Sequence, residues 1–249
     1  LSRARGAFIA ESEVVVRVLI ERGRFPVRSL LLADARLDKL ADLLPRIAAD
    51  VPVYVASQAV LDGIVGFHIH RGVLASGARL PPQSATDLLG MTPASDARVV
   101  VLESLTNHDN VGGVFRNAAA FGAEAVLFDK ATCDPLYRKA IRVSVGGSLI
   151  VPYAEGTLAE HVAVLRARGY TIVALSPSDP RSENIAEMAP LGPVALLLGT
   201  EGAGLTPAAL DAADRVAKID IVPAFDSLNV ATTCGIALHR VRSWTRHRG

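Results

Sequence analysis

The sequence predicts an α/β protein whose larger part is a parallel β-sheet flanked by helices. The first observation is the run Val194–Leu198, where apolar residues follow one another without alternation, as in strands buried on both faces. The second is that such runs alternate with helical patterns along the chain. The third is the stretch after the run, where Gly199, Gly202 and Gly204 let the backbone turn tightly and approach a ligand. Because ligands of open α/β sheets bind beyond the carboxyl ends of strands, we expect a site here.

The first 78 residues predict a small α/β unit of their own. We expect strands at 29–32, 51–55 and 72–75, and helices at 14–19, at 37–47 and after Ser57, which can cap the third helix. The second of these helices depends on the apolar spacing of Leu37, Leu40, Leu43, Leu44 and Ile47. Residues 79–96 carry prolines and glycine among small polar residues, which is typical of an interdomain linker, with one short helix at 85–89.

Residues 97–249 predict the domain with the parallel sheet. We expect strands at 98–102, 124–128, 171–175 and 194–198, and helices at 134–145, 158–168 and 208–213. A further helix begins at Asp109 or Asn110, either of which can cap it, and ends at Gly122. A second apolar run opening at Ile219 resembles another buried strand, and Ser227 can cap a last helix that follows it.

Composition excludes several classes of protein. The 249 residues carry a net charge of +1 and two cysteines, and no apolar run is long enough to span a membrane. Cysteines so few and so far apart favour a reducing compartment, and no signal-like segment is visible, so we expect a cytoplasmic protein. Because the first residue is Leu, we expect an initiating segment to precede it. His68 and His70 have no third ligand near them, so we expect no metal site.

Three motifs occur in order in the second domain. The first places Asn110, Gly112, Arg116, Ala118, Phe121 and Gly122 as N-x-G-x-x-x-R-x-A-x-x-F-G; the second is G-x-E-x-x-G-L from Gly199 to Leu205; the third is S-L-N-V from Ser227 to Val230. Together they resemble the SpoU/TrmH family of the SPOUT superfamily, which are S-adenosylmethionine-dependent RNA ribose 2′-O-methyltransferases. The resemblance implies a deep C-terminal trefoil knot, whereas general topology rules favour an unknotted, doubly wound sheet.

The resemblance also covers the first domain and the partners. The segments FIAESEVV and HRGVLA are similar to the substrate-binding domain that precedes many SpoU-type catalytic domains, a ribosomal-protein-like RNA-binding fold. The implied partners are ribosomal or transfer RNA, with ribosomal RNA favoured, and a second copy of the chain. A homodimer is also favoured by the apolar residues of the last helix, Ile236, Leu238, Val241 and Trp244. Arginines expected to contact RNA are Arg3, Arg5, Arg22, Arg24, Arg71, Arg138 and Arg142.

The motif positions imply roles for single residues. The implied catalytic residues are Arg116, Asn110, Glu201, Ser227 and Asn229. The residues implied to bind S-adenosylmethionine are Leu198, Gly199, Thr200, Glu201, Gly202, Ile221, Val222, Pro223, Ser227, Leu228, Asn229 and Ala231. An arginine stays protonated in proteins, so Arg116 is expected to position the nucleotide and stabilise the developing alkoxide rather than to act as a base. The final acceptor of the proton stays open.

The sequence departs from the family pattern at several positions, and other interpretations of these residues stay open. Asp220-Ile221 stands where the family commonly has Pro-Met, Pro223 where Gly is usual, and Asn107-His108 in place of Asp-Pro. Taken singly, Asn110 and Ser227 can be mere helix caps and Glu201 a surface carboxylate. One alternative function is a catalytically silent RNA-binding protein of the same fold. A dinucleotide-binding enzyme is disfavoured because no G-x-G-x-x-G follows the first strand.

Overall fold

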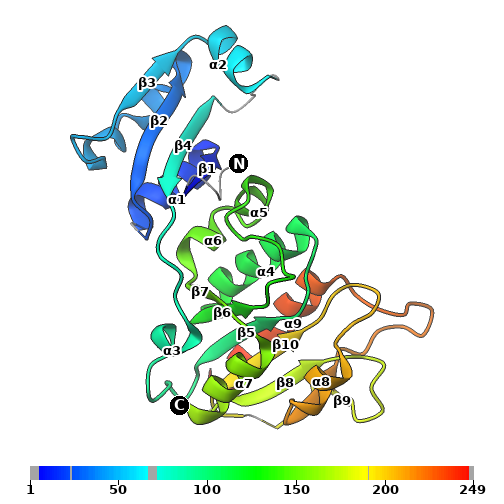
Figure 1. Cartoon of the computed structure of the whole chain (residues 1–249). Coiled ribbons are helices and arrows are strands. Elements are labelled where there is room, and N and C mark those ends of the chain that lie inside the picture. Colours follow the sequence, from blue (N-terminus) through cyan, green and yellow to red (C-terminus); the bar gives the residue numbers. More distant parts are fainter. Residues whose placement is uncertain (1–5, 23, 67–71, 190, 247–249) are drawn as a thin grey trace.

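The chain folds into two β-sheets, each with its own helices, as the computed structural model shows for residues 6–22, 24–66, 72–189 and 191–246 (Figure 1). The first sheet has four strands in the order β1-β4-β2-β3; β4 runs antiparallel to both of its neighbours and β2 parallel to β3. Its elements are β1 (Ala7–Glu11), α1 (Glu13–Arg22), β2 (Val27–Ala33), β3 (Val53–Ala56), α2 (Gln58–Val65) and β4 (Val73–Ala78).

The helix expected at 37–47 was predicted wrongly. The structure has three separate 3₁₀ turns in this region, η2 (Asp34–Arg36), η3 (Asp38–Leu40) and η4 (Leu44–Arg46). The spacing of Leu37, Leu40 and Leu43 is three residues each time, which equals one turn of 3₁₀ helix as well as it approximates an α-helix. Pro45 also lacks the backbone N–H that a continuous α-helix needs at this position. Leu40 and Leu43 are nevertheless buried, as the pattern indicated.

The second sheet has seven parallel strands in the order β7-β6-β5-β10-β8-β11-β9. They are β5 (Arg98–Leu102), β6 (Ala125–Phe128), β7 (Tyr153–Glu155), β8 (Thr171–Leu175), β9 (Glu183–Asn184), β10 (Val194–Leu198) and β11 (Arg215–Lys218). The bounds expected for β5, β8 and β10 are confirmed. The strand expected from Ile219 onward ends before that residue, at Lys218.

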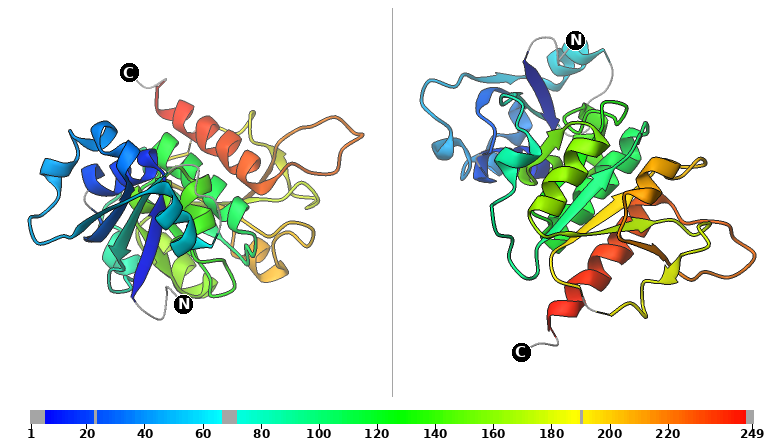
Figure 2. Two further views of the ribbon diagram at one scale, coloured as in Figure 1. Left: turned by 90° about the horizontal axis from the view of Figure 1, so that it is seen from above. Right: turned by 60° about the horizontal axis from the view of Figure 1, so that its bottom comes forward.

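Helices cover both faces of this sheet. They are α3 (Ala85–Leu88), α4 (His108–Phe121), α5 (Arg138–Val143), α6 (Gly147–Ile150), α7 (Leu158–Ala167), α8 (Pro207–Asp211) and α9 (Val230–Arg246). Side chains alternate along the central strands, so Val100 of β5 packs with α4 and α9, whereas Val99 packs with α3, α7 and α8. The result is a three-layer arrangement that places α4 and α9 together on one face (Figure 2).

The two sheets are joined by a shared hydrophobic core. Leu136, Ile141 and Leu149 belong in sequence to the second domain, yet they pack into the cluster formed by Phe8, Leu19 and other residues of the first. All three are 0–1% exposed. The segment between β4 and β5 also runs along the second domain rather than free of it (Figure 1), and its Ala85 and Leu89 are buried there. The two halves of the chain therefore pack as one body.

A tight turn at 144–147 lies at the centre of this junction. Val145 adopts a φ of +53° and Gly146 a φ of +82°, a region that favours glycine. A Cβ on Gly146 would lie 2.9 Å from Cγ1 of Val18 in α1, and one on Gly147 would lie 2.7 Å from the carbonyl oxygen of Phe115 in α4. The turn thus connects the first domain to α4 by direct contact on both sides.

No helix in the described ranges has the length and apolarity that crossing a membrane requires.

Candidate functional site

The carboxyl ends of β5 and β10 meet at the middle of the sheet, where the chain leaves the two strands toward opposite edges. Such a topological switch point is where open α/β sheets bind ligands. Here the backbone nitrogen of Glu103, just after β5, donates to the carbonyl oxygen of Leu198 at 2.9 Å. The buried carboxylate of Glu103 accepts from the backbone nitrogen and hydroxyl of Thr206 at 2.9 and 2.8 Å. The loop at 199–205 is thereby held closed against β5.

Glycines shape this loop in the way its sequence indicated. A Cβ on Gly199 would lie 2.6 Å from the backbone nitrogen of Leu205, so only glycine fits there. Gly202 and Gly204 have φ angles of +85° and +70°. Thr200 pairs with Gly204 in a short antiparallel bridge, with the Gly204 nitrogen 3.1 Å from the Thr200 oxygen. Above Gly202 a Cβ would enter open space, so a ligand can approach the backbone closely at this point.

The three motifs converge on one side chain, that of Asn229. Its amide nitrogen donates to Oδ1 of Asn110 at 2.8 Å and to Oε1 of Glu201 at 3.0 Å. Its Oδ1 accepts from the backbone nitrogens of Ala231 and Thr232 at 2.9 and 3.2 Å. Asn110 is 6% exposed, whereas Glu201 and Asn229 face solvent. A single amide thus fixes the start of α4, the loop after β10 and the start of α9 relative to one another.

Two helix caps differ from the sequence-based expectation. The cap of α9 is Asn229 and not Ser227, which lies exposed two residues earlier. The cap of α4 is Asn107, whose Oδ1 accepts from the nitrogen of Asp109 at 2.8 Å, so neither Asp109 nor Asn110 caps this helix. The side chain of Asn110 is therefore available for its contact with Asn229. Asn107 stands where Asp is frequent in the family, and its side-chain oxygen can cap the helix as that of Asp would. This departure therefore preserves the helix cap.

Arg116 lies in a shallow groove of about 500 Å³ between α4 and α9. Its side chain is exposed, and no hydrogen bond or ion pair within the described ranges holds it. The two helices approach closely here, because a Cβ on Gly113 would lie 2.6 Å from the Cβ of Ala231. Asn117 fixes the contact by donating to the carbonyl oxygen of Ala231 at 2.6 Å. Arg116 thus lies on a well-packed helix, with its side chain exposed in the groove.

Asn117 and Glu103 are site residues that the sequence interpretation missed. Asn117 directly follows Arg116 in the interior of a predicted helix, although asparagine is a poor helix former. This conflict between residue type and position could have marked Asn117 as a site residue. Glu103 is a carboxylate directly after the strand predicted at 98–102, which places it at the end of the sheet where ligands bind.

The residues Ile221, Val222, Pro223, Ser227 and Leu228 lie on the segment that connects β11 to α9. This segment extends away from the body of the molecule in all three views (Figures 1 and 2), and Val222 is 66% exposed. A turn closes its tip, with the Phe225 nitrogen 3.1 Å from the Val222 oxygen. At its base Asn184 donates to Oδ2 of Asp220 at 2.6 Å, which gives the unusual Asp220 a structural partner. Of the expected cofactor residues, Leu198–Gly202, Asn229 and Ala231 lie close to the convergence at Asn229.

The arginines expected to bind RNA occupy different surroundings. Arg22 and Arg142 are exposed. Arg24 donates to the carbonyl oxygen of Val151 at 3.0 Å, and Arg138 pairs with the buried Glu11 at 2.7 Å, so both connect the two domains. Arg3, Arg5 and Arg71 lie outside the described residues, as do His68 and His70.

The thiol of Cys234 is not set up as a nucleophile. Cys234 lies in α9, and burial raises its pKa to about 12, so its thiol stays protonated. Within the ranges that the structure describes, no three His, Cys, Asp or Glu side chains are grouped to hold a metal ion.

Comparison with known proteins agrees with this arrangement. A model of the SpoU rRNA methylase family matches residues 97–239. An uncharacterized tRNA/rRNA methyltransferase of Mycobacterium tuberculosis is 38% identical over 98% of this chain and 83% of its own length. The 23S rRNA (guanosine-2′-O-)-methyltransferase RlmB of Acinetobacter baylyi is 29% identical over 83% of each chain. The SpoU methyltransferase AviRb of Streptomyces viridochromogenes, solved in complex with AdoMet, superposes with a TM-score of 0.82 at 23% identity, covering 99% of this chain and 93% of that one.

Proposed function

We propose, because this chain belongs to the SpoU rRNA methylase family, that it transfers a methyl group from S-adenosylmethionine to a ribose 2′-hydroxyl of ribosomal RNA. The observation that carries the proposal is the convergence of Asn110, Glu201 and Asn229, one residue from each motif, beside the helix that bears Arg116. A catalytically silent RNA-binding protein is disfavoured, because such a protein has no need to keep this constellation.

The loop at 199–205 fits the cofactor by its shape. Glycine backbone with positive φ and open space above Gly202 lets backbone N–H and C=O groups contact a ligand directly. We assign Leu198, Gly199, Thr200, Glu201 and Gly202 to one side of the cofactor. The residues assigned to the other side are Ile221, Val222, Pro223, Ser227, Leu228, Asn229 and Ala231. When bound, S-adenosylmethionine supplies a methyl group that is activated for transfer by the positive charge on its sulfur.

The protein's own part is to align the ribose and to stabilise the charge that develops on its oxygen. The Arg116 guanidinium cannot accept the proton, since it stays protonated, but it can hold the nucleotide and stabilise an alkoxide as the hydroxyl proton leaves. Asn229 holds Glu201 and Asn110 in place by hydrogen bonds. Ser227, exposed on the same segment, is proposed to contact the reacting groups after that segment closes over the cofactor.

The substrate-binding role belongs to residues 1–78, with 79–96 as the linker and 97–249 as the catalytic domain. This division is supported by the end of the first sheet at Ala78 and the start of the second at Arg98. We propose a ribosomal-protein-like RNA-binding fold for the first domain and assign RNA contacts to the exposed Arg22 and Arg142. Arg24 and Arg138 act between the domains. A cytoplasmic location follows from an RNA substrate of this kind.

We further propose a homodimer and a knotted C-terminal segment. Leu238 and Val241 were expected to need a partner, but both are buried in the chain's own core, so that part of the argument was wrong. The structure does not describe the side chain of Trp244. The dimer is supported instead by Ile236, which is 40% exposed, and by Phe121 and His239 beside it in the groove that contains Arg116. The knot is supported by the contact of Glu201 with Asn229, which brings the two loops together.

The experiment is a methylation assay on unmodified 23S ribosomal RNA with S-adenosylmethionine that carries a labelled methyl group. We expect label at one ribose, located by nuclease digestion and mass spectrometry. A methyl group found on a base, or label in transfer RNA alone, would contradict the proposal.

A further inference from the structure

A cavity of about 340 Å³ lies between the linker, the first domain and the carboxyl ends of β6 and β7. Its position is notable because β6 and β7 end at the same edge of the sheet as β5 and β10, where the methylation site lies. The residues that line it include Arg24, Phe25, Arg79, Pro81, Tyr153 and Glu155. The volume is at the small end of the range for ligand sites, about 300–1,000 Å³, and suits a single flat ring system.

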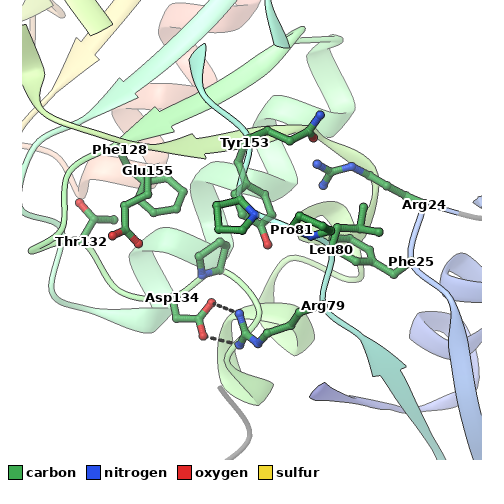
Figure 3. A pocket seen from close by; sticks show the side chains of 13 residues that line it. Arg24, Phe25, Arg79, Leu80, Pro81, Phe128, Thr132, Asp134, Tyr153 and Glu155 are labelled. Carbon is green, nitrogen blue, oxygen red and sulfur yellow. Dashed lines mark hydrogen bonds and ion pairs between the residues drawn. The ribbon is translucent and has the colours of Figure 1, made fainter. Parts of the chain in front are cut away.

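Planar side-chain groups line the cavity. The Arg24 guanidinium lies 5.1 Å from the centre of the Tyr153 ring and 4.9 Å from that of Phe25. The rings of Tyr153 and Phe128 are 5.7 Å apart and tilted. Figure 3 shows Pro81 and Leu80 facing Tyr153 from the linker. Aromatic and guanidinium planes are the surfaces on which proteins stack unpaired RNA bases.

The charges around the cavity are balanced. Arg79 pairs with Asp134 through both guanidinium nitrogens (Figure 3). The rest of the lining carries one further cation, Arg24, and one further carboxylate, Glu155. The lining as a whole therefore carries no net positive charge that would favour a phosphate group. A neutral ring with polar edges suits the cavity better than a phosphate or a dinucleotide.

The end of the cavity remote from Arg24 has polar side chains that can form hydrogen bonds with the edge of a ring. Figure 3 shows Glu155 and Thr132 at one end, opposite Arg24 and Phe25. Glu155 is exposed at the last position of β7, and its carboxylate accepts hydrogen bonds but donates none. An amino group on a base is a donor that such a carboxylate would accept. Thr132 connects this end to the loop between β5 and α4, because its hydroxyl donates to Asp129 at 2.8 Å and accepts from the nitrogen of Leu105 at 3.2 Å.

We propose that this cavity binds an unpaired nucleobase of the substrate RNA, held between the flat groups that line it and recognised through its amino group by Glu155. Adenine, cytosine and guanine carry such a group, and uracil does not. The RNA origin of the base rests on the function proposed above. The cavity would then hold a nucleotide near the target and help select the RNA at a point remote from the methyl group.

The test uses the full chain saturated with S-adenosylhomocysteine, so that an adenine ring cannot enter the cofactor loops instead. AMP, CMP, GMP and UMP are titrated separately while NMR follows the backbone amides of Leu80, Gln83 and Gly156. We expect these amides to shift with AMP, CMP and GMP at several-fold lower concentrations than with UMP. Glu155→Gln should weaken the three by about tenfold, since hydrogen bonds to a charged group are the strong ones. The control, Glu187→Gln, removes an exposed carboxylate outside the cavity and should change nothing.

Three results would overturn the proposal: equal binding of UMP, displacement of the nucleotides by inorganic phosphate, or equal effects of the two glutamine variants. A second measurement separates this cavity from the proposed function. With 23S ribosomal RNA as substrate, Glu155→Gln should raise KM and leave kcat unchanged. Base binding without any methylation by the unmodified chain would reject the function and keep the cavity, whereas methylation without base binding would do the reverse.

Discussion

Asn229 donates a hydrogen bond of 2.8 Å to Oδ1 of Asn110, a residue 119 positions earlier in the chain. The same nitrogen reaches Glu201 at 3.0 Å, and the oxygen of the same amide caps α9. The nitrogen and the oxygen of this amide therefore both form hydrogen bonds, and the two can be tested separately. An aspartate keeps the oxygen that caps the helix and loses the N–H that joins the motifs.

We expect Asn229→Asp to keep most of the stability of the native protein and to lose most of its turnover. A carboxylate still caps α9, but it faces the carboxylate of Glu201 without a donor between them. Asn229→Ala should lose the cap as well, which lowers the free energy of unfolding by about 1 kcal/mol. Chemical denaturation and the methylation assay measure the two effects. The matched control is Asn107→Asp, which caps α4 in the same manner without touching Glu201; equal loss of turnover in both aspartate variants would contradict the role of Asn229.

Arg116→Ala should reduce kcat by about 10²–10³, the usual effect of removing one group that stabilises a developing charge. The melting temperature and the affinity for S-adenosylhomocysteine should not change, because the side chain is exposed and packs on neither loop. Arg116→Lys should recover only part of the loss, since an ammonium cannot reproduce the planar fork of donors. Turnover equal to that of the native chain at saturating RNA would remove Arg116 from the mechanism.

Gly147→Ala should reduce both stability and turnover. The new Cβ would lie 2.7 Å from the Phe115 oxygen and 3.2 Å from the Cα of Arg116, so α4 must shift to accommodate it. Overpacking of this kind costs about 1–3 kcal/mol of unfolding free energy. Gly90→Ala is the control, because a Cβ there meets no atom within 4 Å. If Gly147→Ala melted and turned over like Gly90→Ala, the turn at 144–147 would not position the helix that bears Arg116.

Removal of residues 1–83 should leave a catalytic domain that aggregates. It exposes Leu136, Ile141 and Leu149, each of which contributes about 1.5–3 kcal/mol when buried. It also leaves Arg138 without the carboxylate of Glu11. Solubility and melting temperature measure the effect. A truncated chain as soluble and as heat-stable as the full chain would show that the shared core contributes little.

Acid should destabilise the protein through His161. Burial lowers the pKa of this histidine, which is 2% exposed and whose Nε2 faces the carbonyl oxygen of Phe128 at 3.2 Å. The unfolded chain binds the proton near pH 6.5, about its ordinary value, and the folded chain only at lower pH. Unfolding free energy is therefore retained above about pH 6.5 and falls as the pH drops below it. Between pH 7 and pH 5 the fall should be smaller in His161→Gln; equal slopes would contradict this account.

The sequence predicted best where neighbouring residues alone decide the structure. Strands β5, β8 and β10 are short runs of branched apolar residues ended by polar or glycine residues, and their bounds were predicted correctly. By contrast, β7 is a strand of three residues preceded by a proline, too short for a pattern to appear. The helix expected at 134–145 is confined to Arg138–Val143, because the side chain of Asp134 closes a turn with the nitrogen of Leu136 at 2.9 Å.

What the sequence could not show are the contacts between distant segments. The resemblance of the three motifs to a known family implied that Asn110, Glu201 and Asn229 belong to one site, but not that a single amide joins them. The sequence alone does not distinguish an arginine that binds RNA from one that contacts a neighbouring domain. Only the fold shows that Arg24 donates to the carbonyl oxygen of Val151. The burial of Leu136 against the first sheet was hidden in the same way, because its cluster includes Phe8 and Leu19, which are more than a hundred residues away.

The shared core also sets an order of events during synthesis. The first sheet is complete in sequence once Ala78 has been added, but its hydrophobic cluster still lacks Leu136, Ile141 and Leu149. At about 5–20 residues per second, a ribosome needs roughly 4–14 seconds to add the stretch between these points. During that interval the nascent first domain carries an unfilled apolar surface. We therefore expect it to engage chaperones until α6 emerges, and to fold together with the front half of the catalytic domain rather than ahead of it.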